Sequence, residues 1–378
     1  MRRTVYTPEH EAFRVSVRRF FETEVVPEYL SWEATGTPPR WFWKRCGELG
    51  ILGIGVPDAY GGKPGATFKH SAIVTEEAQR LGLTLGGLRV QTDICMPYFL
   101  EYGTAEQHEA WLPRLTSGDA VCALAMSEPA AGSDMKAMAT RARRDGDYYV
   151  VDGGKTFITN GLSADLVVLA VKTDPEAGRR GISLLVVEAA SDGFERGRKL
   201  EKIGLRTQDL SELFFTDMVV PASSRLGDEG RGFEYMTNNL AQERLSIALN
   251  AQAAAVAALD QTVAAVQRRT QDEGAPDQAT KFALAGCHAD VAAGQALADR
   301  ALDAHEQRDL DPADAAAVKL FCTELQGTVA DRCLQVLGAA AYNRVDPVGR
   351  AFADARVSRI YGGSTEIMKV IVAKAMGL

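Results

Sequence analysis

The sequence predicts an α+β protein built as a helical block, a β-rich block and a second helical block along its 378 residues. Two patterns lead to this class. Before residue 118 and after residue 231, apolar residues recur every three or four positions, which is typical of helices with one buried face. Between these blocks they form short β-branched runs separated by Gly- and Asp-rich turns. We expect three domains, at residues 1–118, 119–228 and 229–378.

The first block is expected to be entirely helical. Gly and Pro interrupt the hydrophobic spacing and so divide the block into separate helices. In chain order the helical segments read PEHEAFRVSVRRFFETEVV, PRWFWKRCGELG, FKHSAIVTEEAQRLG and CMPYFLEYG.

The second block reads as a series of short strands. The turns DGD, DGG and TDPEAG separate the strand-like runs, and this regular spacing is typical of a small antiparallel barrel or sandwich. The runs are VCALAM, YYVVDG, KTFIT, DLVVLAV, GISLLVVE and ELFFTDMVV.

The third block follows the loop GDEGRG at residues 227–232 and is again helical. Polar segments that carry Gly or Pro divide it. We expect long helices at about 231–270, 277–307 and 312–341, and two shorter helices after residue 346.

Composition excludes several classes of partner. The net charge of −8 and the scattered basic residues argue against nucleic-acid binding, which needs clustered Lys and Arg. The most apolar helical stretch, residues 246–259, is interrupted by Asn250 and Gln252 and is too short to span a membrane. The charged N-terminus MRRTVYTPEHEAF does not resemble a secretory signal, so we expect a cytoplasmic location.

The sequence motifs for metal binding and for phosphate binding are incomplete. The six cysteines form no CxxC pair and are expected to be buried free thiols. The stretch LGIGVPDAYGG has Asp58 where a Rossmann fingerprint needs glycine, and the GGKT at 153–156 would put the first P-loop glycine at Tyr149. A nucleotide cofactor must therefore be held in another way.

One charged pair lies on an apolar helix face. At 100° per residue, Glu243 and Arg244 fall on the stripe that should be buried. Burying charges is costly unless they are paired or face a functional cavity. The pair is therefore a structural ion pair, part of a site, or a sign that this helix turns its stripe toward a solvated interface. The apolar residues of this stripe are Phe233, Met236, Leu240, Ile247, Ala251, Ala254 and Ala258.

Five longer motifs resemble those of the acyl-CoA dehydrogenase family and follow one another in the same order as in the family. The resemblance is greatest to its long-chain and isovaleryl-type members. The resemblance covers nearly the whole chain. It implies an N-terminal helical domain, a central β-domain and a C-terminal four-helix bundle. The motifs are LAMSEPAAGSD (124–134), GDYYVVDGGKTFITNG (146–161), RKLEKIGLRTQDLSELFFTDMVVP (198–221), QERLSIA (242–248) and RIYGGSTEIMK (359–369).

The resemblance also implies an activity and its partners. Family members remove the α-proton and the β-hydride of an acyl-CoA thioester, which requires FAD as the hydride acceptor. An electron-transfer flavoprotein is the implied electron acceptor. A homotetramer is the implied assembly, in which FAD lies between the last two domains and reaches a neighbouring subunit.

The cofactor residues are carried over from the matching motifs. Ser127 occupies the position of the hydroxyl that bonds the flavin ring, and Ser133 lies near a phosphate or the CoA moiety. Phe157 and Ile158 match residues packed on the ring, and Thr159 offers a hydroxyl to the hydride-accepting nitrogen. The other implied FAD contacts are Leu124, Met126, Gly132, Arg268, Gln335, Gly338, Ser364 and Glu366.

The catalytic base follows from the same comparison. Many members carry a glutamate where this chain has Gly362, whereas long-chain and isovaleryl types keep glycine there and place the base on the helix that contains Glu-Arg. We therefore expect Glu243 to be the base. Arg244 and Gly363 are expected to contact substrate, as is Ser133, and the Gly362 N–H to bond the thioester oxygen. Glu366 is the rival base, but helix capping explains it adequately.

Two segments depart from the family pattern. Gln271, Asp272 and Glu273 replace a Phe-Gly-Lys that follows the arginine at Arg268, and QVLGAAA places Ala339 and Ala341 where glycines usually approach the cofactor. These changes predict weaker FAD binding. They leave open a partner subunit with an impaired site, and the sequence also leaves open an acyl-CoA oxidase. Acyl chain length, and CoA versus a carrier protein, are not determined.

Overall fold

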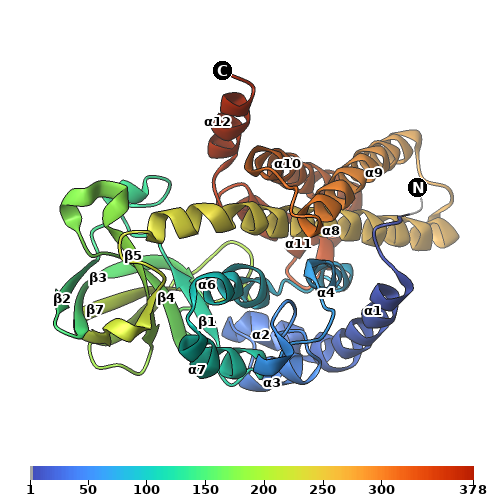
Figure 1. Ribbon diagram of the computed structural model, residues 1–378. Coiled ribbons are helices and arrows are strands. Elements are labelled where there is room, and N and C mark those ends of the chain that lie inside the picture. Colours follow the sequence, from blue (N-terminus) through green and yellow to red (C-terminus); the bar gives the residue numbers. More distant parts are fainter. Residues whose placement is uncertain (1–2) are drawn as a thin grey trace.

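The computed structural model describes residues 3–378, except for the side chains of residues 136, 272 and 273. Figure 1 shows helices, a sheet and a second set of helices in chain order, as the sequence predicts. The long helix α8 crosses the molecule, with the N-terminal helices on one side and α9 and α10 on the other. The sheet lies at one end of α8.

The N-terminal part contains seven α-helices among the described residues. Thr7 and Thr104 begin two of them, and each side-chain oxygen accepts a hydrogen bond from the backbone N–H three residues on. Two π-helical segments interrupt the α-helical pattern, at Phe21–Val25 and Val90–Cys95 (η4). The helices are α1 (Pro8–Phe20), α2 (Tyr29–Thr35), α3 (Arg40–Glu48), α4 (Phe68–Arg80), α5 (Gly86–Arg89), α6 (Met96–Tyr102) and α7 (Ala105–Thr116).

The middle part is an eight-stranded sheet in the order β6-β7-β3-β2-β4-β5-β8, with β1 paired to β4. Most pairs are antiparallel, as expected, but β1–β4 and β2–β4 are parallel. Parallel neighbours need a crossover connection, which short strand patterns do not reveal. The strands are β1 (Cys122–Ala125), β2 (Arg141–Asp145), β3 (Tyr148–Thr159), β4 (Leu166–Lys172), β5 (Ile182–Glu188), β6 (Phe194–Lys199), β7 (Leu210–Pro221) and β8 (Arg225–Leu226).

Strand β4 joins two cores. Its residues Leu166, Val168 and Ala170 pack with the N-terminal helices and the start of α8, whereas Val167 and Leu169 pack inside the sheet domain. A strand buried on both faces reads as a continuous apolar run, which explains the sequence DLVVLAV. The sheet is thereby fixed against the helices that carry the site.

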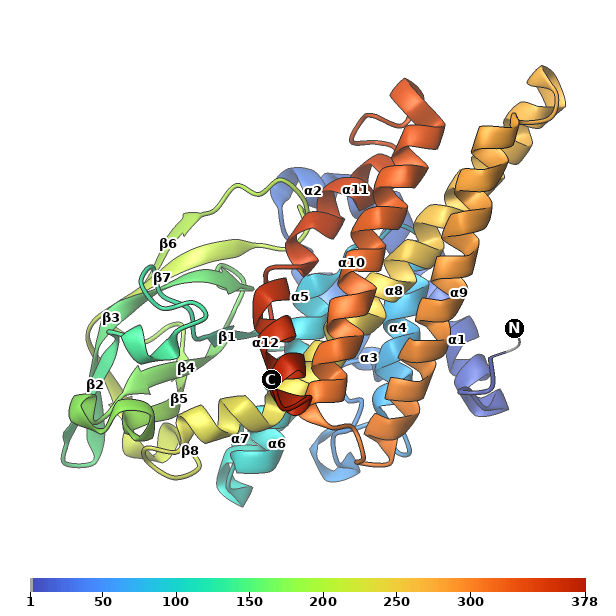
Figure 2. The same cartoon turned by 90° about the horizontal axis from the view of Figure 1, so that it is seen from above.

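The C-terminal part contains α8 (Gly232–Glu273), α9 (Gln278–Glu306), α10 (Pro312–Leu337), α11 (Pro347–Ser358) and α12 (Thr365–Ala375). Seen from above, α8, α9 and α10 run alongside one another (Figure 2). Helix α10 ends four residues before the predicted limit, because Gly338 adopts a left-handed φ of 65°. The short α12 projects from the body of the molecule (Figure 1).

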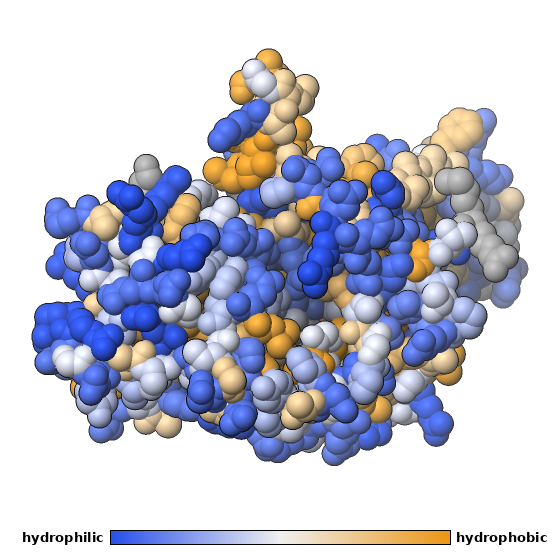
Figure 3. Space-filling view, in the orientation of Figure 1, coloured by the Kyte–Doolittle hydropathy of each residue, from blue (hydrophilic) through white to orange (hydrophobic). Residues whose placement is uncertain are grey.

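None of the helices among the described residues is both long and apolar enough to cross a membrane. Figure 3 shows apolar side chains gathered on the projecting α12, above a surface that is largely polar. On this helix Val370 is 63% exposed, and Met376, directly after the helix, is 69% exposed.

Candidate active site

Glu243 lies on α8, three turns from its start, with its side chain turned into the protein. The residue is 4% exposed, and its Oε1 accepts a hydrogen bond of 3.1 Å from the hydroxyl of Tyr98 on α6. Tyr98 itself is fully buried. The buried acid that the stripe on α8 predicts is thus present, and its described hydrogen-bond partner is a neutral phenol.

The surroundings of Glu243 favour its neutral form. Burial raises the pKa of Glu243 to about 7, although the Tyr98 hydrogen bond and the Arg244 charge oppose this effect. Burial also raises the pKa of Tyr98, so its hydroxyl keeps its proton and remains a donor. A carboxyl group with a pKa near neutrality can accept and release a proton at physiological pH.

Arg244 follows Glu243 but forms no ion pair with it in the described structure. The residue is 6% exposed, and its buried Nε has no hydrogen-bond partner among the described groups. Burial lowers the pKa of Arg244, and the Glu243 carboxylate opposes this effect. The described structure therefore does not contain the Glu243–Arg244 ion pair that was the structural alternative to a site. An incompletely bonded buried guanidinium is available for an anionic or carbonyl oxygen.

Gly362 and Gly363 form the turn between α11 and α12, with φ values of 62° and 93°. A Cβ atom at position 362 would lie 2.2 Å from Cδ1 of Ile247, which is one turn beyond Glu243 on α8. The turn therefore packs directly on the segment of α8 that carries the acid. In the described chain the Gly362 N–H donates no hydrogen bond.

Glu366 occupies a different environment. It is exposed in the first turn of α12, and Ser364 caps that helix by accepting a hydrogen bond from the Ile367 N–H. Hydrogen bonds at this helix start lower the pKa of Glu366. An exposed carboxyl group with a lowered pKa is a poor base, which favours Glu243 over Glu366.

The β-domain contributes a second group of residues. The backbone oxygen of Ser127 accepts a hydrogen bond of 2.9 Å from the Thr156 N–H, which places Ser127 beside the segment that begins with Phe157. Leu124 and Met126 precede it and are half-buried, whereas Gly132 and Ser133 lie exposed in the following loop. The structure therefore brings together the predicted residues 124–133 and 157–159.

Sequence reasoning missed the ion pair that fixes this loop. Lys155 Nζ donates to Glu128 Oε1 at 2.8 Å and to the Met126 carbonyl oxygen at 3.1 Å, and both charged residues are buried. Glu128 also accepts hydrogen bonds from the N–H groups of Ala139 and Thr140. Both residues stand inside the family motifs, and a Lys and a Glu in otherwise apolar runs were the available signal.

Three consecutive residues of β3 point in different directions. Phe157 adopts a left-handed φ of 59° and is 64% exposed, which is unusual for a large apolar residue in a strand. Ile158 is buried in the sheet core, so only its backbone faces the surface that Phe157 presents. Thr159 Oγ1 accepts a hydrogen bond of 2.8 Å from Gln208 Nε2, which leaves the Thr159 O–H free to donate.

These features suit the ring of a flavin. An exposed aromatic side chain held in a strained conformation offers a flat apolar contact, and the adjacent Thr159 hydroxyl is directed by Gln208. Residues Ser127 and Thr159 supply hydroxyls, and Gly132 leaves open space above the loop, since a Cβ atom there would meet no atom within 4 Å. The residues of the β-domain therefore fit the FAD that the resemblance implies.

The remaining predicted cofactor residues lie elsewhere. Arg268 is 25 positions beyond Glu243 on the same helix, which corresponds to about 37 Å. Arg269 bonds the Leu337 carbonyl oxygen, so the ends of α8 and α10 meet and bring Arg268 near Gln335 and Gly338, all three exposed. A single chain does not bring these residues to Ser127. The side chains of Asp272 and Glu273 lie outside the described residues.

The sequence also missed Lys319 on α10. This lysine is fully buried and donates a hydrogen bond of 2.5 Å to the Gly363 carbonyl oxygen. Its helical spacing from the buried residues Ala315, Cys322 and Thr323 marked it as a charge on an apolar face, which is the signal that identified Glu243.

Comparison with known proteins agrees with the motifs. Family models match residues 7–119, 123–218 and 230–377, described as the N-terminal, middle and C-terminal domains of acyl-CoA dehydrogenase. The long-chain specific acyl-CoA dehydrogenase of Sus scrofa mitochondria is 40% identical over 376 residues, covering 98% of this chain and 87% of that protein.

Two solved structures are similar over nearly the whole chain. An acyl-CoA dehydrogenase from Geobacillus kaustophilus superposes with a TM-score of 0.95 at 43% identity and covers 99% of both chains. A glutaryl-CoA dehydrogenase from Mycobacterium smegmatis, described in complex with FADH2, has a TM-score of 0.89 at 27% identity and covers 98% of this chain and 95% of that chain.

Proposed function

Because the chain belongs to the acyl-CoA dehydrogenase family, we propose that it oxidises an acyl-CoA thioester to the trans-2-enoyl thioester in an FAD-dependent reaction. The family predicted from the motifs is thereby confirmed. The similar proteins described above are all dehydrogenases, so they do not favour the alternatives of an oxidase or of a partner subunit with an impaired site.

We propose that Glu243 takes the proton from the α-carbon. The observation that carries this role is a buried carboxyl group, bonded to a neutral Tyr98, on the turn of α8 that packs against Gly362. The ionised form of Glu243 accepts the proton, and the electron pair of the broken C–H bond moves toward the thioester carbonyl. Burial keeps water from competing for the proton.

Two groups of the chain are proposed to stabilise the negative charge on the thioester oxygen. The Gly362 N–H is unused in the described chain and is proposed to donate to this oxygen, with Arg244 adding a positive charge nearby. Gly363 and Ser133 are proposed to contact substrate. FAD, when bound, supplies the acceptor for the hydride that leaves the β-carbon as the double bond forms.

The FAD site is proposed to need two copies of the chain. The β-domain residues Leu124 to Ser133 and Phe157 to Thr159 would hold the flavin, and Ser364 and Glu366 lie on the adjoining C-terminal helix. Arg268, Gln335 and Gly338 would bind the cofactor of a neighbour, since Arg268 lies about 37 Å along α8 from the acid and the other two lie at the end of α10 that meets this end of α8. The homotetramer is proposed from the family, and the apolar surface of α12 (Figure 3) is the kind of surface that binds another protein chain.

Three further parts of the proposal rest on the sequence and the family. The domain limits are 1–118, 119–228 and 229–378. The electron acceptor is an electron-transfer flavoprotein, and the location is cytoplasmic. Acyl chain length is open.

The function is tested by anaerobic titration of the purified, flavin-containing protein with acyl-CoA thioesters of different length. We expect at least one to bleach the oxidised flavin band. Glu243→Gln should bind FAD and ligand but reduce the bleaching rate by about a thousandfold, since a general base typically contributes that much. Glu366→Gln is the matched control and should bleach at the wild-type rate.

Two results would contradict the proposal. A wild-type protein that binds FAD but is bleached by no acyl-CoA is not an acyl-CoA dehydrogenase. Slow bleaching by Glu366→Gln together with normal bleaching by Glu243→Gln would move the base to α12.

A further inference from the structure

We propose that Lys319 is a positioning residue for this reaction, which holds the Gly362–Gly363 turn so that the Gly362 N–H faces the thioester oxygen. The inference rests on the proposed function and extends it to α10, an element that supplies no proposed substrate contact. Lys319 touches the turn rather than the substrate.

The geometry shows a turn held from two helices. From α10, Lys319 Nζ donates to the Gly363 carbonyl oxygen at 2.5 Å. From α8, Ile247 packs beside Gly362, where a Cβ atom would come within 2.2 Å of its terminal Cδ1. The Thr365 N–H donates to the Arg359 carbonyl oxygen at 3.0 Å and closes the loop around both glycines.

Such a turn needs external support because its own residues are flexible. Gly362 and Gly363 both have left-handed φ values, and glycine loses more conformational freedom on folding than any other residue. An oxyanion donor contributes to catalysis only when its N–H is aimed before the charge develops. The Lys319 hydrogen bond fixes the carbonyl group next to that donor.

Stability does not explain why a lysine occupies this position. Lys319 is fully buried, forms no ion pair with a carboxylate in the described structure, and uses one of its three N–H donors in a described hydrogen bond. Burial, together with the neighbouring Arg244 charge, lowers the pKa of Lys319 to about 8. A well-packed apolar side chain would cost less at such a site, which favours a functional reason for the charge.

The test uses flavin-containing Lys319→Met and Lys319→Gln proteins, with Thr323→Val as the control. Thr323 is buried one turn further along α10 and bonds the Lys319 carbonyl oxygen, so its loss perturbs the same helix without touching the turn. We expect Lys319→Met to lower kcat by about ten- to a hundredfold with KM changed less than about threefold. Lys319→Gln keeps an N–H donor, so its kcat should lie between that of Lys319→Met and that of the wild type.

A binding experiment separates positioning from a general loss of packing. A 3-oxoacyl-CoA presents a thioester oxygen, and its bound enolate is measured by its absorbance. An S-alkyl-CoA thioether has no such oxygen. Lys319→Met should weaken binding of the 3-oxoacyl-CoA about tenfold or more and leave binding of the thioether unchanged.

The proposal is overturned if Lys319→Met weakens both ligands equally, or if it matches Thr323→Val in kcat and in both affinities. A failure of the Lys319 proposal can be distinguished from a failure of the proposed function. If wild type is bleached by acyl-CoA and Glu243→Gln is not, the reaction stands whatever Lys319→Met does.

Discussion

Burial gives Glu243 its chemical role. A carboxyl group in water has a pKa near 4 and is a weak base, whereas burial raises the pKa of Glu243 to about 7. The described partner that counteracts this rise by hydrogen bonding is the Tyr98 hydroxyl. A change to Tyr98 should therefore appear first in the pH dependence of proton abstraction.

We predict that Tyr98→Phe raises the pKa of Glu243 by about one unit, because it removes a hydrogen bond that stabilises the charged form. The base acts when ionised, so the rate of flavin reduction rises as pH passes through this pKa. The rise should move to higher pH in the variant. Tyr102→Phe, whose ring centre lies 6.3 Å from that of Tyr98, is the control. An unchanged pH profile in Tyr98→Phe would show that this hydrogen bond does not set the pKa.

A glutamate at position 362 would meet both a close contact with the end of the Ile247 side chain and an unfavourable backbone conformation. Gly362→Glu would place a Cβ atom 2.2 Å from Ile247 and force a left-handed φ on a glutamate. We predict a loss of about 2–4 kcal/mol in the free energy of unfolding, from overpacking and backbone strain together. Gly146→Glu is the matched control, since Gly146 has a φ of 57° and no atom near its Cβ position. Equal losses in the two variants would show that the contact with Ile247 is unimportant.

The elements differ in how far the sequence predicts them. Helix α8 was expected at residues 231–270 and spans Gly232–Glu273, because its apolar spacing and the preceding glycine loop are local signals. The parallel pairing of β1 with β4 depends on which strands meet, which no local pattern records. The π-helical η4, which contains Cys95 near Glu243, also escaped prediction.

The same distinction applies to the candidate site. Glu243 and Gly362 could be proposed from a helix face and a motif. Tyr98 and Lys319 could not be given roles, because each meets its partner across a long separation in sequence: Tyr98 bonds Glu243 on another helix, and Lys319 bonds a turn 44 positions later. The inward direction of Ile158 follows from the twist and bulge of β3 rather than from its composition.

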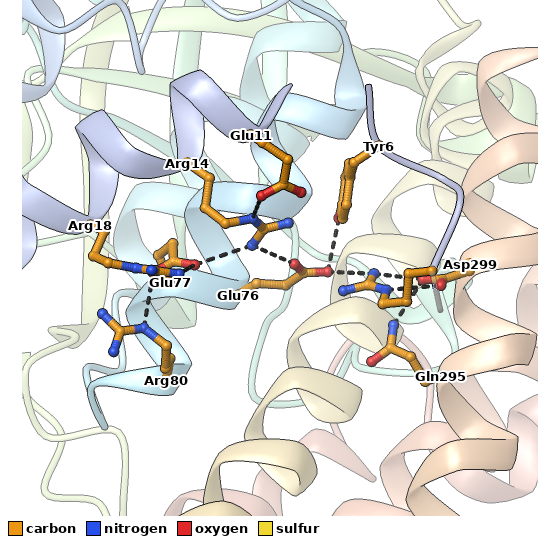
Figure 4. Close-up of polar contacts among 10 residues, drawn as sticks. Tyr6, Glu11, Arg14, Arg18, Glu76, Glu77, Arg80, Gln295 and Asp299 are labelled. Carbon is orange, nitrogen blue, oxygen red and sulfur yellow. Dashed lines mark hydrogen bonds and ion pairs between the residues drawn. The ribbon is translucent and has the colours of Figure 1, made fainter. Parts of the chain in front are cut away.

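A network of charged residues ties α1 to α4 and the N-terminal segment to α9. Figure 4 shows Arg14 bonded to both Glu76 and Glu77, at 2.8 and 3.2 Å. Arg3 joins Glu76 to Asp299 on α9. The carboxylate of Glu77 is 2% exposed, and burial alone would raise its pKa, but hydrogen bonds from arginines outweigh burial and lower it. The arginines are Arg14, Arg18 and Arg80.

We predict that Glu77→Gln lowers the free energy of unfolding by about 2 kcal/mol near neutral pH, because it removes the shared charged partner of the largely buried Arg14 and of the half-exposed Arg18 and Arg80. A lowered folded-state pKa contributes stability that is present above the unfolded pKa and is lost as pH falls. The difference between variant and wild type should therefore shrink in acid. Glu11→Gln, at a residue whose side chain is 54% exposed, is the control. A constant difference between pH 7 and pH 3 would contradict this account.

At the scale of the whole molecule, the two halves of the proposed FAD site lie at opposite ends of one chain. Phe157 and Thr159 are at the sheet end of α8, whereas Arg268 is exposed near its other end. In the proposed arrangement, a second copy whose α8 end reaches this sheet would complete the site. In the same proposal, the departures from the family pattern at residues 271–273, 339 and 341 would fall at the contact with the neighbouring subunit's cofactor.

We predict that Arg268→Ala lowers FAD retention about tenfold without reducing the stability of the flavin-free protein, because an exposed arginine has few contacts to lose within its own chain. Flavin per subunit after gel filtration and the Tm of the flavin-free protein are the measurements. Arg300→Ala, exposed on α9, is the control. Normal flavin content in Arg268→Ala would place the cofactor within a single chain or on other residues.

The account as a whole depends on proton removal by Glu243, and exchange of the α-hydrogen with solvent measures that step apart from hydride transfer. The experiment follows incorporation of deuterium from D2O into the α-position of a bound acyl-CoA analogue that lacks a transferable β-hydrogen. We expect exchange in wild type and in Glu366→Gln, and a rate about a thousandfold lower in Glu243→Gln that still binds FAD and the analogue. Exchange at the wild-type rate in Glu243→Gln would contradict the assignment.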